Sequence, residues 1–122
     1  MRIWQYIVDM AELATAVTTT AASPGASAPE TLEGAAELLK ALASRARLAI
    51  VEQLSRAEQC VHELVENTGL NQPLVSQHLR VLRSAGVVTG NRRGREIAYS
   101  LTDEHLAHIA RDAIRHSEEI HR

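Results

Sequence analysis

The feature that most constrains the fold is a pair of predicted helices joined by a short turn, between residues 60 and 85. Apolar residues recur at helical spacing in segments 60–66 and 72–85. Between them, Gly69 suits the left-handed backbone conformation that ends a helix, and Asn71 can cap the next helix. Pro73 then falls in the first turn, where proline is tolerated. This arrangement predicts a helix-turn-helix.

The flanking segments extend this prediction. Two further helices are expected at 31–42 and 45–54, the second capped by Ser44. After Gly86, strands at 87–89 and 97–100 enclose a polar tip at 90–95, which is typical of a hairpin. A last helix is expected from about 102 to 119, with Thr102 as N-cap and acids in its first turn. We therefore predict a mainly α fold with a small β-hairpin wing, a winged helix-turn-helix.

Length and composition bound the organisation of the chain. At 122 residues it predicts one small domain over 30–122. Residues 1–29 read as an N-terminal extension, with spacing that allows a helix over 1–17 and a linker composition, partly mobile, over 18–29. Phe is absent, so the core must be aliphatic. One cysteine allows no internal disulfide and fits a cytoplasmic location, and no apolar run predicts a membrane span.

Charge is unevenly distributed along the chain. The formal net charge is −2, but residues 45–100 hold eight Arg and five Glu, a net charge of +3. A surface for double-stranded DNA is therefore expected in this middle part. On the second helix of the helix-turn-helix, glutamine and serine can read base edges and arginine can contact phosphate, and the wing arginines suit phosphate or the minor groove. The predicted DNA-binding residues are Gln72, Ser76, Gln77, Arg80, Arg83, Arg92, Arg93 and Arg95.

Two alternatives stay open for this surface. Its polar residues can be an ordinary solvated face. His78, near the middle of the second helix, is better placed as a structural hydrogen-bonding residue than as a base reader.

The last predicted helix carries four potential zinc ligands, Asp103, His105, His116 and Glu119. The two histidines are eleven residues apart, about 16 Å along a helix that rises roughly 1.5 Å per residue, and they fall on one stripe. That stripe is too long to close around one ion. Two copies packed antiparallel in a homodimer would place Asp103 and His105 of one beside His116 and Glu119 of the other. The plainer alternative is a solvated helix face.

From about 33 to 119 the chain resembles the ArsR/SmtB family of metal-sensing repressors. The resemblance lies in LLKALASRARLAIVEQL, in CVHELVENTGLNQPLVSQHLRVLRSAGVV and in the wing RRGREIAYSL. It implies a homodimeric winged-helix repressor whose dimer is formed by the first and last helices of the domain. It also implies a last-helix zinc site of pattern D-x-H-x10-H-x-x-E, which these four residues match at every position, with cobalt or nickel as other candidate metals.

The resemblance also points to a second candidate metal position. Cys60 matches the leading cysteine of a thiolate-rich site, but His62 replaces the following thiolate and no N-terminal cysteine exists. A soft cadmium, lead or arsenic site is therefore disfavoured. Cys60, His62 and Glu63 can still form a partial second site. The alternative is that Cys60 is a small apolar residue packed under the third helix.

These observations predict a metal-responsive, most simply zinc-responsive, repressor that binds a palindromic operator as a homodimer and leaves it when metal binds across the dimer interface. The resemblance implies a link from His116 to backbone near Gly86. An alternative is a winged-helix regulator with Cys60 as a redox switch, although no resolving thiol exists in the chain. We do not expect an enzyme, because four protein ligands leave zinc no open position for water. A purely architectural DNA-binding dimer is a weaker alternative.

Overall fold

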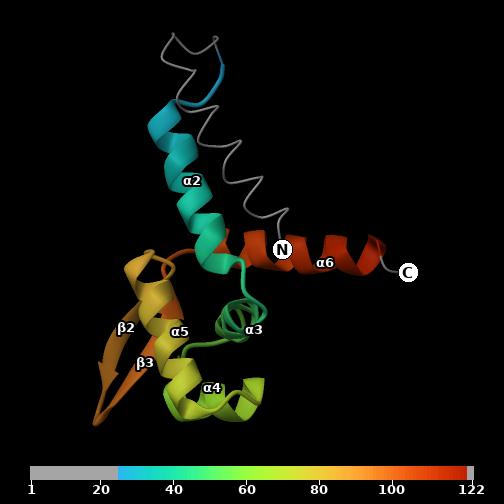
Figure 1. The fold of residues 1–122 in the computed structure, drawn as a ribbon. Coiled ribbons are helices and arrows are strands. Elements are labelled where there is room, and N and C mark those ends of the chain that lie inside the picture. The colour runs from blue at the N-terminus through green and yellow to red at the C-terminus, as the bar shows by residue number, and fades with distance from the viewer. Residues whose placement is uncertain (1–24, 121–122) are drawn as a thin grey trace. The chain divides into compact units, whose positions relative to one another are not determined.

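The computed structural model describes residues 25–120, and within them five helices and three strands. They are α2 (Pro29–Leu42), α3 (Arg45–Leu54), β1 (Gln59–Cys60), α4 (Val61–Thr68), α5 (Gln72–Ser84), β2 (Val88–Arg93), β3 (Glu96–Leu101) and α6 (Glu104–Ile120) (Figure 1). The helix expected at 1–17 lies outside the described residues. The chain divides into two units, Met1–Ala36 and Glu37–Arg122, and the fold of the second is described below. No described helix is long and apolar enough to cross a membrane.

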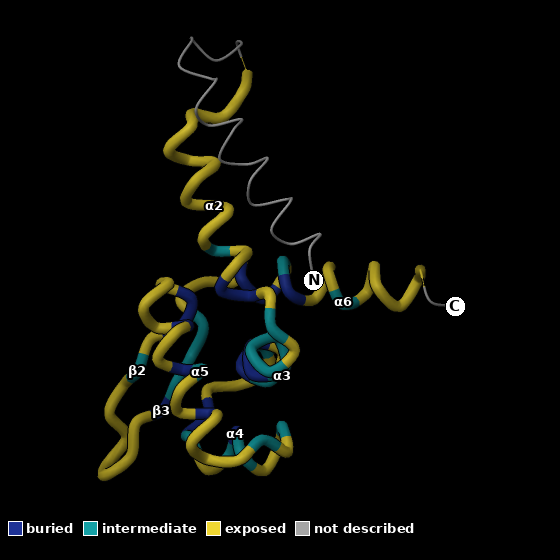
Figure 2. The backbone as a smooth tube through the Cα atoms, viewed as in Figure 1, coloured by how far each residue is buried: buried dark blue, intermediate teal, exposed yellow. Residues whose placement is uncertain are grey.

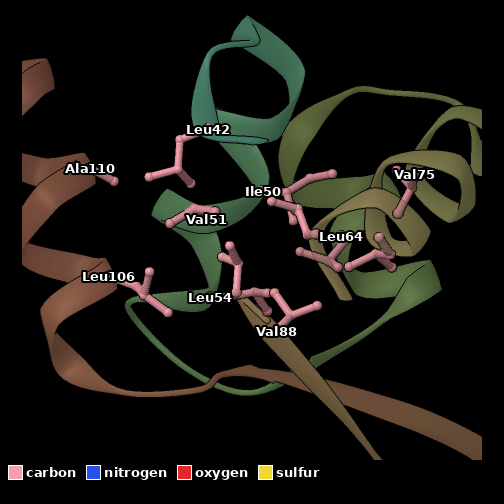
Figure 3. Packing of buried hydrophobic residues seen from close by; sticks show 12 residues of the cluster. Leu42, Ile50, Val51, Leu54, Leu64, Val75, Val88, Leu106 and Ala110 are labelled. Carbon is pink, nitrogen blue, oxygen red and sulfur yellow. The ribbon is translucent and has the colours of Figure 1, made fainter. Parts of the chain in front are cut away.

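The core of the second unit is aliphatic, as its composition predicts. Ile50, Val51, Leu64 and Val75 are fully buried, and α6 contributes Leu106 and Ala110. In Figure 3 the side chains of α3 lie between those of α6 on one side and those of α4 and α5 on the other. Helix α3 is therefore the central element against which the helix-turn-helix and the last helix both pack.

The turn between α4 and α5 follows the sequence prediction. Gly69 has φ of 76° and ends α4 in the left-handed conformation. Asn71 Oδ1 accepts a hydrogen bond from the Leu74 amide at 3.0 Å and caps α5. A side-chain cap satisfies one of the amides that the first turn of a helix leaves without a partner. The helix-turn-helix is confirmed.

The wing differs in detail from the prediction. Strands β2 and β3 pair antiparallel from Val88 opposite Leu101 to Arg93 opposite Glu96, so most of the expected tip at 90–95 is strand. The turn narrows to Gly94, with φ of 63°, and Arg95. Strand β1, which the sequence did not predict, adds to β3 and gives the sheet order β1-β3-β2. A two-residue strand is too short to leave a period in the sequence.

The start of α6 also corrects a prediction. Asp103, not Thr102, caps the helix, since Asp103 Oδ1 accepts a hydrogen bond from the Leu106 amide at 3.3 Å. Thr102 instead donates its hydroxyl to the Gly86 carbonyl at 2.7 Å. This bond joins the residue just before Asp103 and α6 to Gly86, two residues beyond the end of α5. Both threonine and aspartate cap helices well, so the sequence alone does not separate them.

Candidate DNA-binding and metal-binding surfaces

Helix α5 has one buried face and one exposed polar face. Val75, Leu79 and Leu82 are buried and anchor it on the core. Figure 2 shows that α5 carries both buried and exposed positions along its length. The predicted DNA-contacting residues of this helix are all exposed: Gln72, Ser76, Gln77, Arg80 and Arg83. These five side chains therefore lie on the solvent-exposed side of α5, away from the core.

The wing presents its three predicted arginines, Arg92, Arg93 and Arg95, on an exposed hairpin. Arg93 is already engaged, because its Nη2 lies 2.9 Å from Oε1 of Glu58, just before β1. This hydrogen bond raises the pKa of the Arg93 guanidinium. Arg92 and Arg95 form no ion pair with any of the described residues 25–120. The three wing arginines therefore differ in the contacts that they make within the protein.

A second polar contact joins the wing to the start of α4. His62 Nδ1 lies 3.0 Å from Oε1 of Glu96, the first residue of β3. Together with the Arg93–Glu58 pair, it joins both strands of the hairpin to the segment around β1. No local pattern in the sequence indicates Glu58 or Glu96, because both contacts join residues about 35 positions apart.

The residues of the predicted partial second metal site make other contacts. The Glu63 carboxylate accepts the Cys60 amide at 2.9 Å, which lowers the pKa of Glu63, and His62 pairs with Glu96. Cys60 is buried, and burial, helped by the Glu96 and Glu63 carboxylates, raises the pKa of its thiol. Within residues 25–120 no three His, Cys, Asp or Glu side chains are placed to hold a metal ion. The structure therefore does not assemble this site.

The four predicted ligands of the last helix are exposed and lie at its two ends. Asp103 Oδ1 and His105 Nδ1 are 3.4 Å apart, with side chains 52% and 90% exposed. His116 and Glu119 are exposed near the C-terminal end of the same helix. Since α6 is continuous from Glu104 to Ile120, His105 and His116 are separated by about 16 Å at roughly 1.5 Å per residue. A single chain therefore brings together the first pair of ligands but not all four.

His78 behaves as predicted, as a hydrogen-bonding residue rather than part of the exposed face. It is half-buried, and its Nδ1 lies 3.3 Å from Nη1 of Arg47 on α3. Arg47 was not singled out from the sequence, where it looks like one of several arginines of a polar helix face. No local pattern indicates a partner 31 residues away.

A helix-turn-helix with an exposed polar recognition helix and an arginine-bearing wing defines a DNA-binding transcription regulator. The family model described as "Bacterial regulatory protein, arsR family" matches residues 44–89. This chain belongs to that family.

Its relatives agree with this assignment. The chain is 58% identical over 90 residues to the HTH-type transcriptional repressor SmtB of Mycobacterium tuberculosis, covering 74% of this chain and 67% of that protein. It is 46% identical over 98 residues to the HTH-type transcriptional regulator NmtR of the same species, covering 78% and 82%. A homodimeric winged helix-turn-helix DNA-binding domain, Mb0332 from Mycobacterium bovis, has a TM-score of 0.67 and 29% identity, covering 80% and 92%. The chain is a transcription regulator, not an enzyme.

Proposed function

We propose that this protein is a zinc-responsive repressor that binds a palindromic operator as a homodimer in the cytoplasm and releases it when zinc is bound. Its membership of a family of DNA-binding regulators supports the part of this proposal that concerns repression and DNA binding. The response to zinc and the role of the dimer are argued below from the residues of α6.

The DNA-reading surface fits one half-site per protomer. The amide side chains of Gln72 and Gln77 suit adenine, and Ser76 can serve any base as donor or acceptor. Arg80 and Arg83, further along α5, suit phosphate contacts that set register without reading sequence. Two such helices in a symmetric dimer read two half-sites about one helical turn of DNA apart, about 34–36 Å. A palindromic operator follows from that symmetry.

The arrangement of donors on α6 is the single observation that carries the metal response. It offers two imidazoles and two carboxylates, a donor set that suits tetrahedral zinc. All four residues are exposed, and Asp103 and His105 already lie together. The second pair sits at the far end of the helix, so a complete set needs a second chain. Exposed Leu39 on α2 and Ile120 on α6 are apolar surface that such a partner would cover.

The four proposed ligands of this site come from the two ends of α6. Asp103 and His105 supply donors beside the start of α6, and His116 and Glu119 supply donors near its end. Bound zinc would supply bonds that join donors of both protomers. Because Thr102 donates to the carbonyl of Gly86, two residues beyond the end of α5, the segment that leads into α6 is tied to the end of the recognition helix. A changed arrangement of the two α6 helices would therefore reach α5 through this hydrogen bond. The same donors also accept cobalt or nickel.

The test is a titration of operator binding with zinc. The full chain is used to select its operator from random DNA, and affinity is then measured at rising free zinc. We expect weakening of about 5- to 150-fold, the usual range of coupling between two sites. His105→Ala and His116→Ala should bind operator as tightly as wild type and ignore zinc. Unchanged wild-type affinity at micromolar free zinc would refute the proposal.

The redox alternative finds no support in the surroundings of Cys60. Its thiol is buried and its pKa is raised, whereas a redox-sensing cysteine is accessible and has a lowered pKa.

A further inference from the structure

Arg47 joins three helices through one guanidinium group. It lies in the first turn of α3, where its amide is capped by Ser44 Oγ at 3.3 Å. Its Nε donates to the carbonyl of Ala41 in the last turn of α2, at 2.5 Å. Its Nη1 lies 3.3 Å from Nδ1 of His78, in the middle of recognition helix α5. A single side chain thus touches the end of one helix and the centre of another.

Each of these contacts satisfies a specific need. The carbonyls of a helix's last turn have no partner within the helix, and a cation is favoured there by the helix dipole. The Ala41 carbonyl and the Arg47 guanidinium meet both conditions. Arginine has only donors, so Nδ1 of His78 must be the acceptor, with the imidazole neutral and its hydrogen on Nε2. The planar fork of arginine can serve two acceptors at once, which a lysine ammonium on a flexible stem does less well.

The hydrogen bond between Arg47 and Ala41 also differs from the other contacts of α2. Within residues 25–120, no other side-chain hydrogen bond or ion pair joins α2 to another helix. On α5, His78 sits beside Gln77 and one turn before Leu82, between the exposed DNA-facing residues and the buried anchor residues. Apolar packing alone lets a helix slide or rotate slightly, whereas a hydrogen bond of fixed geometry restricts both.

We propose that Arg47 is a positioning residue for DNA recognition, which fixes the recognition helix through His78 to the end of α2. In a dimer, this fastening keeps the two recognition helices at the separation that a palindromic site demands. The proposal rests on the dimeric operator binding proposed above, but it needs no metal. It assigns Arg47 and His78 to the spacing of half-sites, not to base or phosphate contact.

The experiment measures how strictly the full chain discriminates half-site spacing, in the absence of metal. Affinities are determined for the selected operator, for versions with one base pair added to or removed from the centre, and for unrelated DNA. Arg47→Lys keeps the charge but cannot bridge both acceptors. We expect it to reduce the preference for the native spacing about tenfold, a size typical of a coupled polar contact. Affinity for unrelated DNA should change less than about twofold, because the phosphate contacts remain.

Four further variants make the result specific. Arg45→Lys, an exposed arginine two residues earlier, is the matched control and should leave the spacing preference unchanged. His78→Ala should reproduce Arg47→Lys, and the double variant should be no worse than either single variant, as for two ends of one interaction. His78→Gln restores an acceptor and should recover much of the preference. His78→Ala leaves the contact between Arg47 and Ala41 in place, so it keeps the test usable if Arg47→Lys does not fold.

The outcomes separate this proposal from the previous one. Equal loss of affinity for every DNA in the two single variants would show a merely structural role and overturn the proposal, as would a preference unchanged from wild type. If the wild type itself ignores spacing, dimeric reading of a palindrome fails and the positioning role fails with it. If the wild type discriminates and responds to zinc while Arg47→Lys also discriminates, only the positioning role is lost.

Discussion

At the residue scale, the surroundings of Cys60 disfavour the reactive, deprotonated form of its thiol. Its side chain is buried at the start of α4, where two carboxylates face it and its own amide is bonded to Glu63. Burial and nearby negative charge both disfavour the thiolate, which is the form that attacks oxidants and binds metals.

The first prediction concerns that thiol. In the folded protein at neutral pH, Cys60 should react with a thiol reagent at least about tenfold more slowly than after unfolding in denaturant, because its pKa is raised. The rate of reaction with an aromatic disulfide reagent measures this. Cys60→Ser should also keep the zinc response of operator binding. Fast labelling of the native protein would revive the redox alternative.

The second prediction concerns Glu63 and pH. Its carboxylate accepts the Cys60 amide, and the pKa of Glu63 lies below the usual 4.5. A folded-state pKa below the unfolded value gives stability that is present above the unfolded pKa and is lost as pH falls through the folded one. Wild type should therefore melt on the order of 5 °C above Glu63→Gln near neutral pH, a typical size for a helix cap.

That difference in Tm should be constant above the usual carboxyl pKa of 4.5 and shrink as pH falls below it, because the folded carboxylate then takes up a proton. Thermal melts on both sides of this pH, with Glu66→Gln as an exposed control on the same helix, provide the measurement. A constant gap between wild type and Glu63→Gln at all pH values would contradict the proposed role of the charge.

At the scale of elements, the wing makes two side-chain contacts with the segment around β1, in addition to its strand pairing. Arg93 pairs with Glu58 and Glu96 pairs with His62, so the hairpin is fastened to the segment that opens α4. A phosphate that recruits Arg93 must compete with the Glu58 carboxylate. Both side chains of this pair are partly exposed, so the competition takes place in solvent, where a surface pair contributes little.

The third prediction follows from this competition. Glu58→Gln should tighten DNA binding by about two- to fivefold and steepen the log–log dependence of affinity on salt by about one, because Arg93 becomes free for phosphate. Affinity measured from low to moderate salt gives both values. Glu66→Gln, on α4, also removes one negative charge but leaves the Arg93–Glu58 pair intact, so it serves as the control. Equal slopes for the two variants would show that Arg93 does not contact DNA.

The elements that could be predicted are those defined by local patterns. Apolar spacing placed α3, α4 and α5 to within a few residues, and the caps Ser44 and Asn71 formed as expected. β1 and the extension of β2 to Arg93 could not be predicted, since they depend on pairing with β3 across the sequence. The cap of α6 was assigned to Thr102 because two adjacent residues have equal local preference and only the Gly86 contact separates them.

The candidate sites show the same division. The exposure of Gln72, Ser76 and Gln77 follows from the period of α5, so it could be predicted. Arg47, Glu58 and Glu96 matter through partners distant in sequence, and no local pattern reveals them. The four donors of α6 were predicted from spacing alone, and their assembly across two chains stays a prediction.

At the scale of the whole molecule, the proposed function couples α5, the helix proposed to read DNA, to a metal signal that only a dimer can receive. Asp103 and His105 lie at one end of α6 and His116 and Glu119 at the other. Each pair of ligands should bind metal poorly alone, because two protein ligands fill only two of the four positions around a tetrahedral ion. The central claim is therefore that each complete site takes one pair from each protomer.

Mixing two defective variants tests this claim most directly. One carries Asp103→Ala and His105→Ala, the other His116→Ala and Glu119→Ala, and zinc affinity and stoichiometry are measured for each alone and for the mixture after subunit exchange. We predict that neither variant alone binds zinc tightly, whereas mixed dimers regain one complete site, about half the wild-type content. Tight binding by either variant alone, or no recovery in mixed dimers whose formation is verified, would contradict a site shared across the dimer.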